Sequence, residues 1–436
     1  MKKENMIIYQ LALRTFTPEG TLNAAVKLIP YLASLDIDIV YVCPFFVEEN
    51  DDDIATWSPR QIASGTNNPK NPYKIADYFH VDSEYGTDED LKAFVDEAHA
   101  NGLLIMFDLV YLHCGKNAVF IQENPNFVIR DEKGNTSVGE TWPFARLNFE
   151  SRELREYLIG NMEYLLTEYG VDGFRCDVGD GIPLDFWDEA HKHIYNIKPD
   201  LIMLNEGVKP EYLENVFDME YGFEWNSLMI KIFTGEASAR ELKELYIREQ
   251  ETYGKNTSHL IRTIDTHDIA SNAGLNRNEI IMTSKGVEAA LVITNTFDGV
   301  SFIWNGYDVC DNNENCMFSN REHGRRSSIN WSRAFTQEGL RRNKLIKAIH
   351  SLHHNSDAVV NGKFKWIENN APDEVISYCR YSNRQKLLIV VNSKNKAVKT
   401  ELLSDINPVR IVMSGGARNN GNTIDLDAYG YIIAEA

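Results

Sequence analysis

The sequence predicts an α/β protein: a (β/α)8 TIM barrel with a short inserted subdomain after its third strand and a C-terminal antiparallel β-sandwich. Three observations support this prediction. Short apolar runs alternate with amphipathic stretches through residues 1–113 and 149–354, as repeated βα units require. Residues 114–148 lack this alternation, and a stretch this long without a period inside a compact domain is usually functional. After residue 355 the pattern changes to short strands separated by turns, so residues 355–436 are expected to be a separate β domain.

The individual elements follow in order from local patterns. Eight apolar runs rich in β-branched and aromatic residues predict the barrel strands. They lie at residues 6–14, 37–42, 103–110, 171–177, 201–206, 216–219, 260–268 and 300–304. Apolar residues spaced three and four apart predict helices at residues 88–100, 152–169, 287–296 and 339–353. In the last domain the predicted strands are residues 364–367, 375–381 and 387–391.

Composition and charge exclude several classes of function. The 436 residues carry a formal net charge of −20, which would repel a nucleic acid. A neutral sugar is compatible with that charge. No apolar run is long enough to cross a bilayer, so we expect no membrane partner. Hydrophobic and charged residues, at 43% and 25%, are typical of a globular protein.

The six cysteines bear on metal binding and on compartment. None forms a Cys-x-x-Cys pair, so the spacing indicates no zinc site. Cys310 and Cys316 are close enough to suggest a disulfide, but the remaining thiols would stay unpaired. We therefore expect a reducing, cytoplasmic location, while an exported form whose signal has been removed stays open. The basic start followed by an apolar run resembles a signal peptide, but Gln10 interrupts the run, which favours a first barrel strand.

The run at residues 171–177 carries the most informative chemistry. Side chains alternate along a strand, so Arg175 and Asp177 point the same way. A guanidinium beside a carboxylate lowers the pKa of that carboxylate and keeps it ionised, as a carboxylate nucleophile requires. A purely structural Arg–Asp pair would show the same pattern, since such pairs are common.

Two further runs end in acidic residues. Residues 201–206 end in Glu206, and residues 260–268 end in His267 and Asp268. The carboxyl ends of parallel barrel strands form one rim, where catalytic residues lie. Three carboxylates from three strands would therefore converge on one pocket, and glycoside hydrolysis needs such a set.

These residues resemble the α-amylase family of retaining glycoside hydrolases. Four motifs occur in the family's order: a third-strand motif at 108–113, Gly-Phe-Arg-Cys-Asp at 173–177, Glu206, and His267 with Asp268. Residues 71–78 also resemble the family's tyrosine-bearing loop. The resemblance extends over residues 6–354.

The resemblance implies a role for each site residue. Asp177 would be the nucleophile, Glu206 the general acid and base, and Asp268 the third carboxylate that holds sugar hydroxyls. Four more residues would bind the same sugar or support the carboxylates: Tyr73, His113, Arg175 and His267. The inserted subdomain, residues 114–148, would form one wall of the substrate cleft, and its end, residues 145–148, is closer to neopullulanase-like members that act on oligosaccharides.

Departures from the family pattern concern calcium and chain length. Leu112 replaces the asparagine that binds calcium in the family, and an aliphatic side chain offers no oxygen ligand. We expect no metal at this position and no cofactor. Residues 179–181 replace the Lys-His that often follows the nucleophile, which argues against an endo-amylase for long starch chains.

Three functions are compatible with these residues. The first is a retaining hydrolase of α-glucosidic bonds in malto-oligosaccharides or related α-glucans. The second is a 4-α-glucanotransferase or other transglycosidase with the same three carboxylates, in which a sugar replaces water as acceptor. The third is a non-catalytic barrel that binds a sugar or a protein partner; the presence of Asp177, Glu206 and Asp268 disfavours it. The expected partner is an oligosaccharide, and the oligomeric state stays open.

Overall fold

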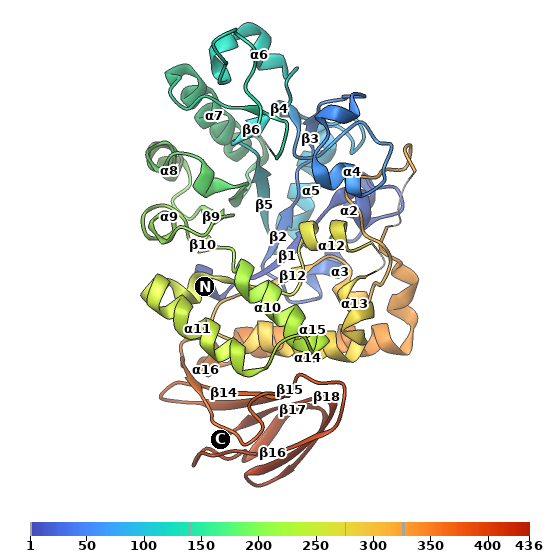
Figure 1. Ribbon diagram of the computed structural model, residues 1–436, viewed down its shortest axis with the longest axis vertical. Helices are drawn as coiled ribbons and strands as arrows, with labels where there is room; N and C mark the ends of the chain where they lie inside the picture. Colours follow the sequence, from blue (N-terminus) through green and yellow to red (C-terminus); the bar gives the residue numbers. More distant parts are fainter. Residues whose placement is uncertain (1, 140, 275, 325–327) are drawn as a thin grey trace.

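The computed structural model describes residues 2–139, 141–274, 276–324 and 328–436. Eight parallel strands form one sheet, and each comes from one of the predicted apolar runs. Around the sheet the order is β10 (Met219–Glu220), β9 (Ile202–Asn205), β8 (Gly173–Cys176), β5 (Leu104–Leu109), β2 (Ile39–Val42), β1 (Ile7–Leu11), β12 (Val300–Trp304) and β11 (Ile261–Arg262). A parallel bridge between Glu220 and Leu260 joins the two ends. The sheet is therefore a closed (β/α)8 barrel, as predicted (Figure 1).

Three strands are clearly shorter than the sequence predicts. The first was expected to run to residue 14, but β1 ends at Leu11 and Leu13 begins helix α1 (Leu13–Phe16). The sixth was expected at 216–219, but Val216 follows helix α9 (Pro210–Asn215) and the strand covers only Met219–Glu220. Val216 and Phe217 are apolar because they are buried in the turn after this helix. The seventh was expected to run to residue 268, but β11 ends at Arg262 and His267 begins helix α12 (His267–Ala273).

The four predicted helices are present: α5 (Asp88–Ala100), α7 (Arg152–Tyr164), α14 (Thr283–Thr296) and α15 (Gln337–Asn355). Thr87 and Asp90 form a reciprocal capping box at the start of α5. A π-helical turn, Leu165–Tyr169, continues α7. The helical backbone therefore extends to residue 169 as predicted, although its last turn has the hydrogen-bond pattern of a π-helix. The remaining helices are α1 (Leu13–Phe16), α2 (Leu22–Val26), α3 (Ile29–Ala33), α4 (Pro59–Ala63), α6 (Val119–Glu123), α8 (Leu184–Ile197), α10 (Phe223–Thr234), α11 (Arg240–Tyr253), α13 (Asn278–Ile281) and α16 (Asp357–Val360).

Two small antiparallel pairs extend beyond the carboxyl ends of the barrel strands. β3 (Phe46–Glu48) pairs with β4 (Ile75–Val81), and β6 (His113–Cys114) pairs with β7 (Ala145–Arg146). The segment between β6 and β7 contains α6 and is the insertion after the third barrel strand. These elements lie at the end of the molecule opposite the C-terminal domain (Figure 1).

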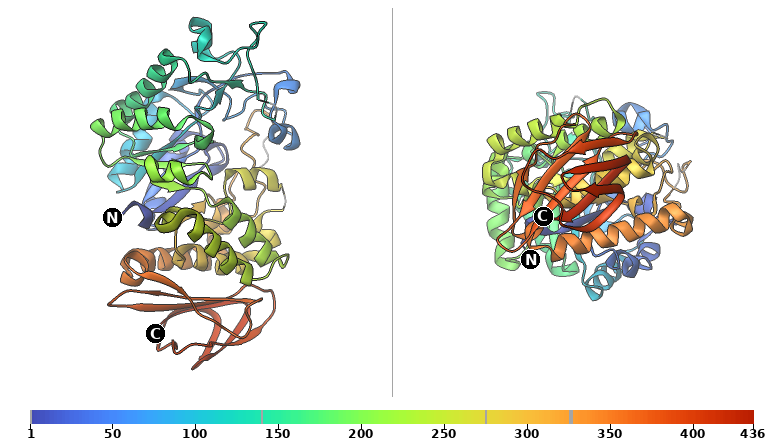
Figure 2. Two further views of the ribbon diagram at one scale, coloured as in Figure 1. Left: turned by 60° about the vertical axis from the view of Figure 1, so that its left-hand side comes forward. Right: turned by 90° about the horizontal axis from the view of Figure 1, so that it is seen from below.

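The C-terminal domain is an antiparallel β domain whose six strands belong to one hydrogen-bonded sheet. One face encloses its own apolar cluster, which includes Leu388 and Val390. The other face, with Ile389 and Val391, joins the main core beneath α14. The sheet therefore packs on the outer helices at one end of the molecule, as the view from below shows (Figure 2). The strands are β13 (Lys363–Trp366), β14 (Val375–Tyr381), β15 (Lys386–Asn392), β16 (Val398–Glu401), β17 (Arg410–Asn420) and β18 (Thr423–Glu435).

All six cysteines are buried free thiols, so Cys310 and Cys316 are not paired with each other. Within the part of the chain that the structure describes, none of the helices has the length and apolar character needed to cross a bilayer.

Candidate active site

The carboxyl ends of three neighbouring strands position the central charges. Parallel pairing places Asp108 of β5 beside Arg175 of β8. Asp177 and Glu206 directly follow β8 and β9 and continue the ladder: the Asp177 N–H donates to the Leu109 carbonyl at 2.9 Å, and the Glu206 N–H to the Cys176 carbonyl at 3.1 Å. Both carboxyl groups therefore leave the sheet at the same height on the rim.

One buried guanidinium holds three carboxylates. Arg175 Nη1 donates to both oxygens of Asp108, at 2.7 and 2.8 Å, and to Asp177 Oδ1 at 3.0 Å. Arg175 Nη2 lies 2.7 Å from Glu206 Oε2 in a close ion pair that is not aligned as a hydrogen bond. Asp108, although part of the third-strand motif, was not among the predicted site residues. It neutralises much of the charge that Arg175 would otherwise offer Asp177.

The charge balance changes the expectation for Asp177. Burial raises the pKa of Asp177 well above its usual range; Arg175 opposes this shift, while Glu206, Asp108 and Asp268 add to it. The sequence suggested that Arg175 keeps this carboxylate ionised. In the structure, Arg175 alone does not do so. Because one guanidinium faces three carboxylates, the cluster favours binding one proton.

Val178 links the loops that follow β8 and β9. Its N–H donates to Glu206 Oε2 at 2.8 Å. Its φ of +43° is a left-handed conformation that a β-branched residue rarely adopts. Strained backbone of this kind persists where the surrounding structure holds it, often at active sites. Here it directs an amide toward the carboxyl group of Glu206.

On the opposite side of the site, Asp268 forms an ion pair with Arg60 of α4. Burial tends to raise the pKa of Asp268, but the positive charge and hydrogen bond of Arg60 oppose this, and the pKa of Asp268 lies below its usual value. The Arg60 guanidinium also lies over the Trp142 ring, 5.3 Å from its centroid. Arg60 thus connects a barrel loop, the third carboxylate and the inserted segment.

His267 and Tyr73 form a stacked pair, with ring centroids 5.3 Å apart. His267 Nδ1 lies 2.6 Å from Gln10 Nε2, and its Nε2 lies 2.8 Å from the Tyr73 hydroxyl, which donates to Asp108 at 3.0 Å. These contacts are all satisfied when the imidazole is neutral and carries its proton on Nε2. Burial lowers the pKa of His267, which favours that state.

His113 approaches the site from the other side. Its Nε2 lies 3.7 Å from Asp177 Oδ2, and burial, with the charge of Arg146, lowers its pKa to about 3. Beside it, the Leu112 side chain packs toward Gly181. An aliphatic surface replaces the oxygen that calcium would need, so these residues do not fit a calcium ion. Among the described residues no group of three His, Cys, Asp or Glu side chains could hold a metal.

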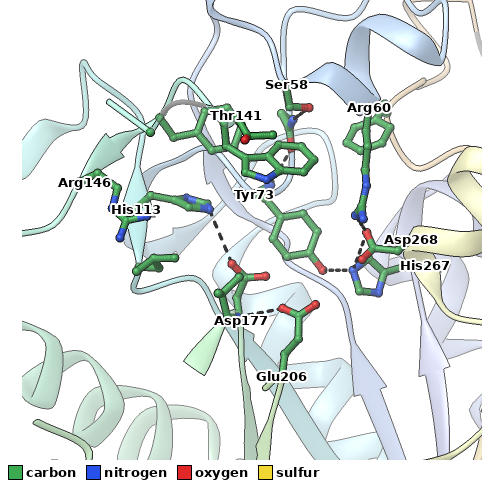
Figure 3. A pocket seen from close by; sticks show the side chains of 17 residues that line it. Ser58, Arg60, Tyr73, His113, Thr141, Arg146, Asp177, Glu206, His267 and Asp268 are labelled. Carbon is green, nitrogen blue, oxygen red and sulfur yellow. Dashed lines mark hydrogen bonds and ion pairs between the residues drawn. The ribbon is translucent and has the colours of Figure 1, made fainter. Parts of the chain in front are cut away.

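These side chains surround a cavity of about 520 Å³ (Figure 3). Six of the seven predicted site residues line it: Tyr73, His113, Asp177, Glu206, His267 and Asp268. The seventh, Arg175, lies buried behind them. Sequence reasoning missed the wall residues Ser58, Arg60, Asn71, Thr141, Trp142, Phe144, Arg146 and Phe318. The aperiodic insertion at residues 114–148 was the signal for Thr141, Trp142, Phe144 and Arg146.

A family model described as "Alpha amylase, catalytic domain" matches residues 4–135 of this chain. This part of the chain is similar to the catalytic domain of the alpha-amylase family. Among curated relatives, the maltogenic alpha-amylase of Bacillus acidopullulyticus is 23% identical, over 95% of this chain and 70% of the relative. A cyclomaltodextrinase from a Bacillus species is 23% identical, over 86% of this chain and 66% of its own length. The chain is thus shorter than these alpha-amylase family relatives.

Solved structures of the alpha-amylase family have the same fold. The maltogenic alpha-amylase AmyB from Thermotoga neapolitana superposes with a TM-score of 0.80 at 23% identity, covering 100% of this chain and 97% of that one. An alpha-amylase from Lactobacillus plantarum gives a TM-score of 0.79 at 20% identity, with 99% of each chain covered. At these identities the likeness establishes the fold of this chain.

Proposed function

We propose that the protein is a retaining glycoside hydrolase that cleaves α-glucosidic bonds in malto-oligosaccharides or related α-glucans. The observation that carries this proposal is the arrangement of Asp177 and Glu206 on adjacent nitrogens of Arg175, with Asp268 facing them across one cavity. Retaining enzymes keep their two carboxyl groups roughly 5–5.5 Å apart, and two groups bound to one guanidinium are compatible with that spacing.

The reaction proceeds in two displacements. Asp177 attacks the anomeric carbon while Glu206 gives its proton to the glycosidic oxygen, which leaves with the departing sugar. A covalent glycosyl ester on Asp177 results. Glu206, now ionised, removes a proton from water, and the resulting hydroxyl attacks the anomeric carbon and releases Asp177. Two inversions give a product with the α configuration.

The cavity walls fit a neutral sugar. Tyr73 and Phe144 offer aromatic surface, and Asp268 offers carboxylate oxygens for hydroxyl groups. His113 is neutral near pH 7, because its pKa lies at about 3, so it contributes hydrogen bonding without charge. The same chemistry fits hydrolysis and transfer to a second sugar.

The test is a substrate panel of starch, maltotriose, isomaltose, pullulan, sucrose and trehalose, with the sugar products resolved. We expect glucose and maltose from maltotriose, and NMR should show the α-anomer of the first product. A first-formed β-anomer, or no cleavage of any α-glucan by folded protein, would contradict the proposal.

Transfer is a second candidate, favoured by one specific relative. The alpha-1,4-glucan:maltose-1-phosphate maltosyltransferase of Picrophilus torridus is 24% identical, over 86% of this chain and 58% of that protein. If a sugar hydroxyl replaces water, maltotriose should yield oligomers longer than itself. We also propose a cytoplasmic location, which the six buried free thiols support.

A further inference from the structure

Asn205, the last residue of β9, directly precedes Glu206 and is fully buried. Its Nδ2 donates to Glu220 Oε2 at 3.0 Å, while its Oδ1 has no hydrogen-bond partner in the described structure. The amide lies between two glycines. A Cβ atom on Gly179 would collide with its Oδ1, and a Cβ atom on Gly207 with its Nδ2. Both positions therefore need glycine because the Asn205 side chain occupies the space.

The two glycines belong to the segments that carry the reacting groups. Gly179 is the second residue after Asp177, and Gly207 is the first after Glu206. The Asn205 amide therefore separates the backbone that follows the nucleophile from the backbone that follows the acid. Gly179 is among the positions where this chain departs from the usual family pattern, and Asn205 gives a physical reason for it.

A buried residue holds the Asn205 amide in place. Glu220, at the end of β10, is fully buried, and its Oε1 accepts a hydrogen bond from the Tyr253 hydroxyl at 3.1 Å. The same Tyr253 hydroxyl also lies 3.2 Å from the carbonyl oxygen of Val208, which can accept its hydrogen bond. On the outer side, the Val208 N–H donates to Asp180 Oδ2 at 2.9 Å. The segment after β9 is thus joined to the segment after β8 on one side of the amide and to Glu220 of β10, through Tyr253, on the other.

We infer that Asn205 is a positioning residue that sets the separation between the Asp177 and Glu206 carboxyl groups. This inference rests on the proposed function. Asn205 is buried beneath the rim and lines no part of the cavity, so it acts through Glu206 and not on the sugar. A displacement of about 1 Å in a catalytic group can lower a rate by about 10²-fold.

The test compares two substrates that differ in their need for an acid. Maltotriose has a poor leaving group that Glu206 must protonate, whereas 4-nitrophenyl α-maltoside has a leaving group that departs without a proton. We expect Asn205→Ala to lower kcat on maltotriose by about 10²-fold, with little change in KM and a much smaller loss on the nitrophenyl substrate. Glu220→Ala should behave alike, and Glu220→Gln, which keeps the oxygen acceptor, should recover most of the rate.

The matched control is Asn196→Ala, which removes an exposed asparagine from α8. Equal losses on both substrates in Asn205→Ala would overturn the inference, since general disruption of the site would act on both. Cleavage of neither substrate by the unmodified protein would instead refute the proposed function.

A double-mutant cycle keeps the test decisive if Asn205→Ala is unstable. Gly179→Ala places a Cβ atom against the Asn205 amide, so it should lower the melting temperature and the maltotriose rate in the unmodified chain. In the Asn205→Ala background that collision is gone, and Gly179→Ala should cost little more. Additive effects of the two substitutions would contradict the claim that the Asn205 amide fills the space beside Gly179.

Discussion

At the scale of residues, the central carboxylates of the site outnumber the guanidinium groups paired with them. Arg175 faces Asp108, Asp177 and Glu206, and Arg60 is paired with Asp268. The nucleophile and the acid therefore share one guanidinium with Asp108, and burial together with the neighbouring carboxylates raises the pKa of Asp177. The sequence showed the Arg175–Asp177 pair but not this sharing, because Asp108 is distant along the chain.

The first prediction concerns the two reacting carboxyl groups. Asp177→Asn and Glu206→Gln keep size and shape but remove the nucleophile or the proton donor. Each should lower kcat on maltotriose by about 10⁴-fold or more, with little change in melting temperature. The control is Asp200→Asn, at an exposed position. Normal turnover in either folded variant would exclude the proposed mechanism.

The second prediction concerns the pH dependence set by Arg60. The pKa of Asp268 is lowered in the folded protein, partly by Arg60, so Asp268 stays ionised until the pH falls through that low value. Arg60→Ala removes the cation, and the pKa of Asp268 should rise. The acidic limb of kcat/KM should then shift to higher pH, whereas Arg60→Lys should shift it less. Superimposable profiles would show that Arg60 does not control this group.

At the scale of elements, regular periodicity made strands and helices predictable, and irregular contacts did not. The capped helix α5 and strand β12 lie where the sequence placed them. The short strands β10 and β11 were overestimated because apolar residues in neighbouring turns are buried for other reasons. Arg60 and Trp142 come from segments without a period, so their meeting over the cavity depends on tertiary structure alone.

The third prediction concerns the loop after β5, where Leu112 precedes His113. Because an aliphatic side chain cannot coordinate a hard cation, activity and melting temperature should survive prolonged treatment with a chelator. The measurement is thermal unfolding and maltotriose turnover with and without chelation. A large fall in melting temperature that calcium restores, with metal bound beside Leu112, would show that oxygen ligands come from elsewhere in this loop.

At the scale of the whole molecule, fold and candidate site were predictable to different depths. The barrel and the C-terminal β domain followed from the order of strands and helices. The identity of the principal site residues followed from where acidic residues end apolar runs. The distribution of protons and the role of Asn205 did not, because both depend on distances between β5, β8, β9 and β10 that only the closed barrel sets.

The central claim is that Asp177 becomes covalently glycosylated, and trapping that ester tests it most directly. In Glu206→Gln, α-maltosyl fluoride can react without an acid, but no base remains to activate water. Intact-mass measurement should show an increase of one maltosyl unit, and the modified peptide should contain Asp177. Release of fluoride with no adduct, or an adduct on another residue, would contradict the mechanism.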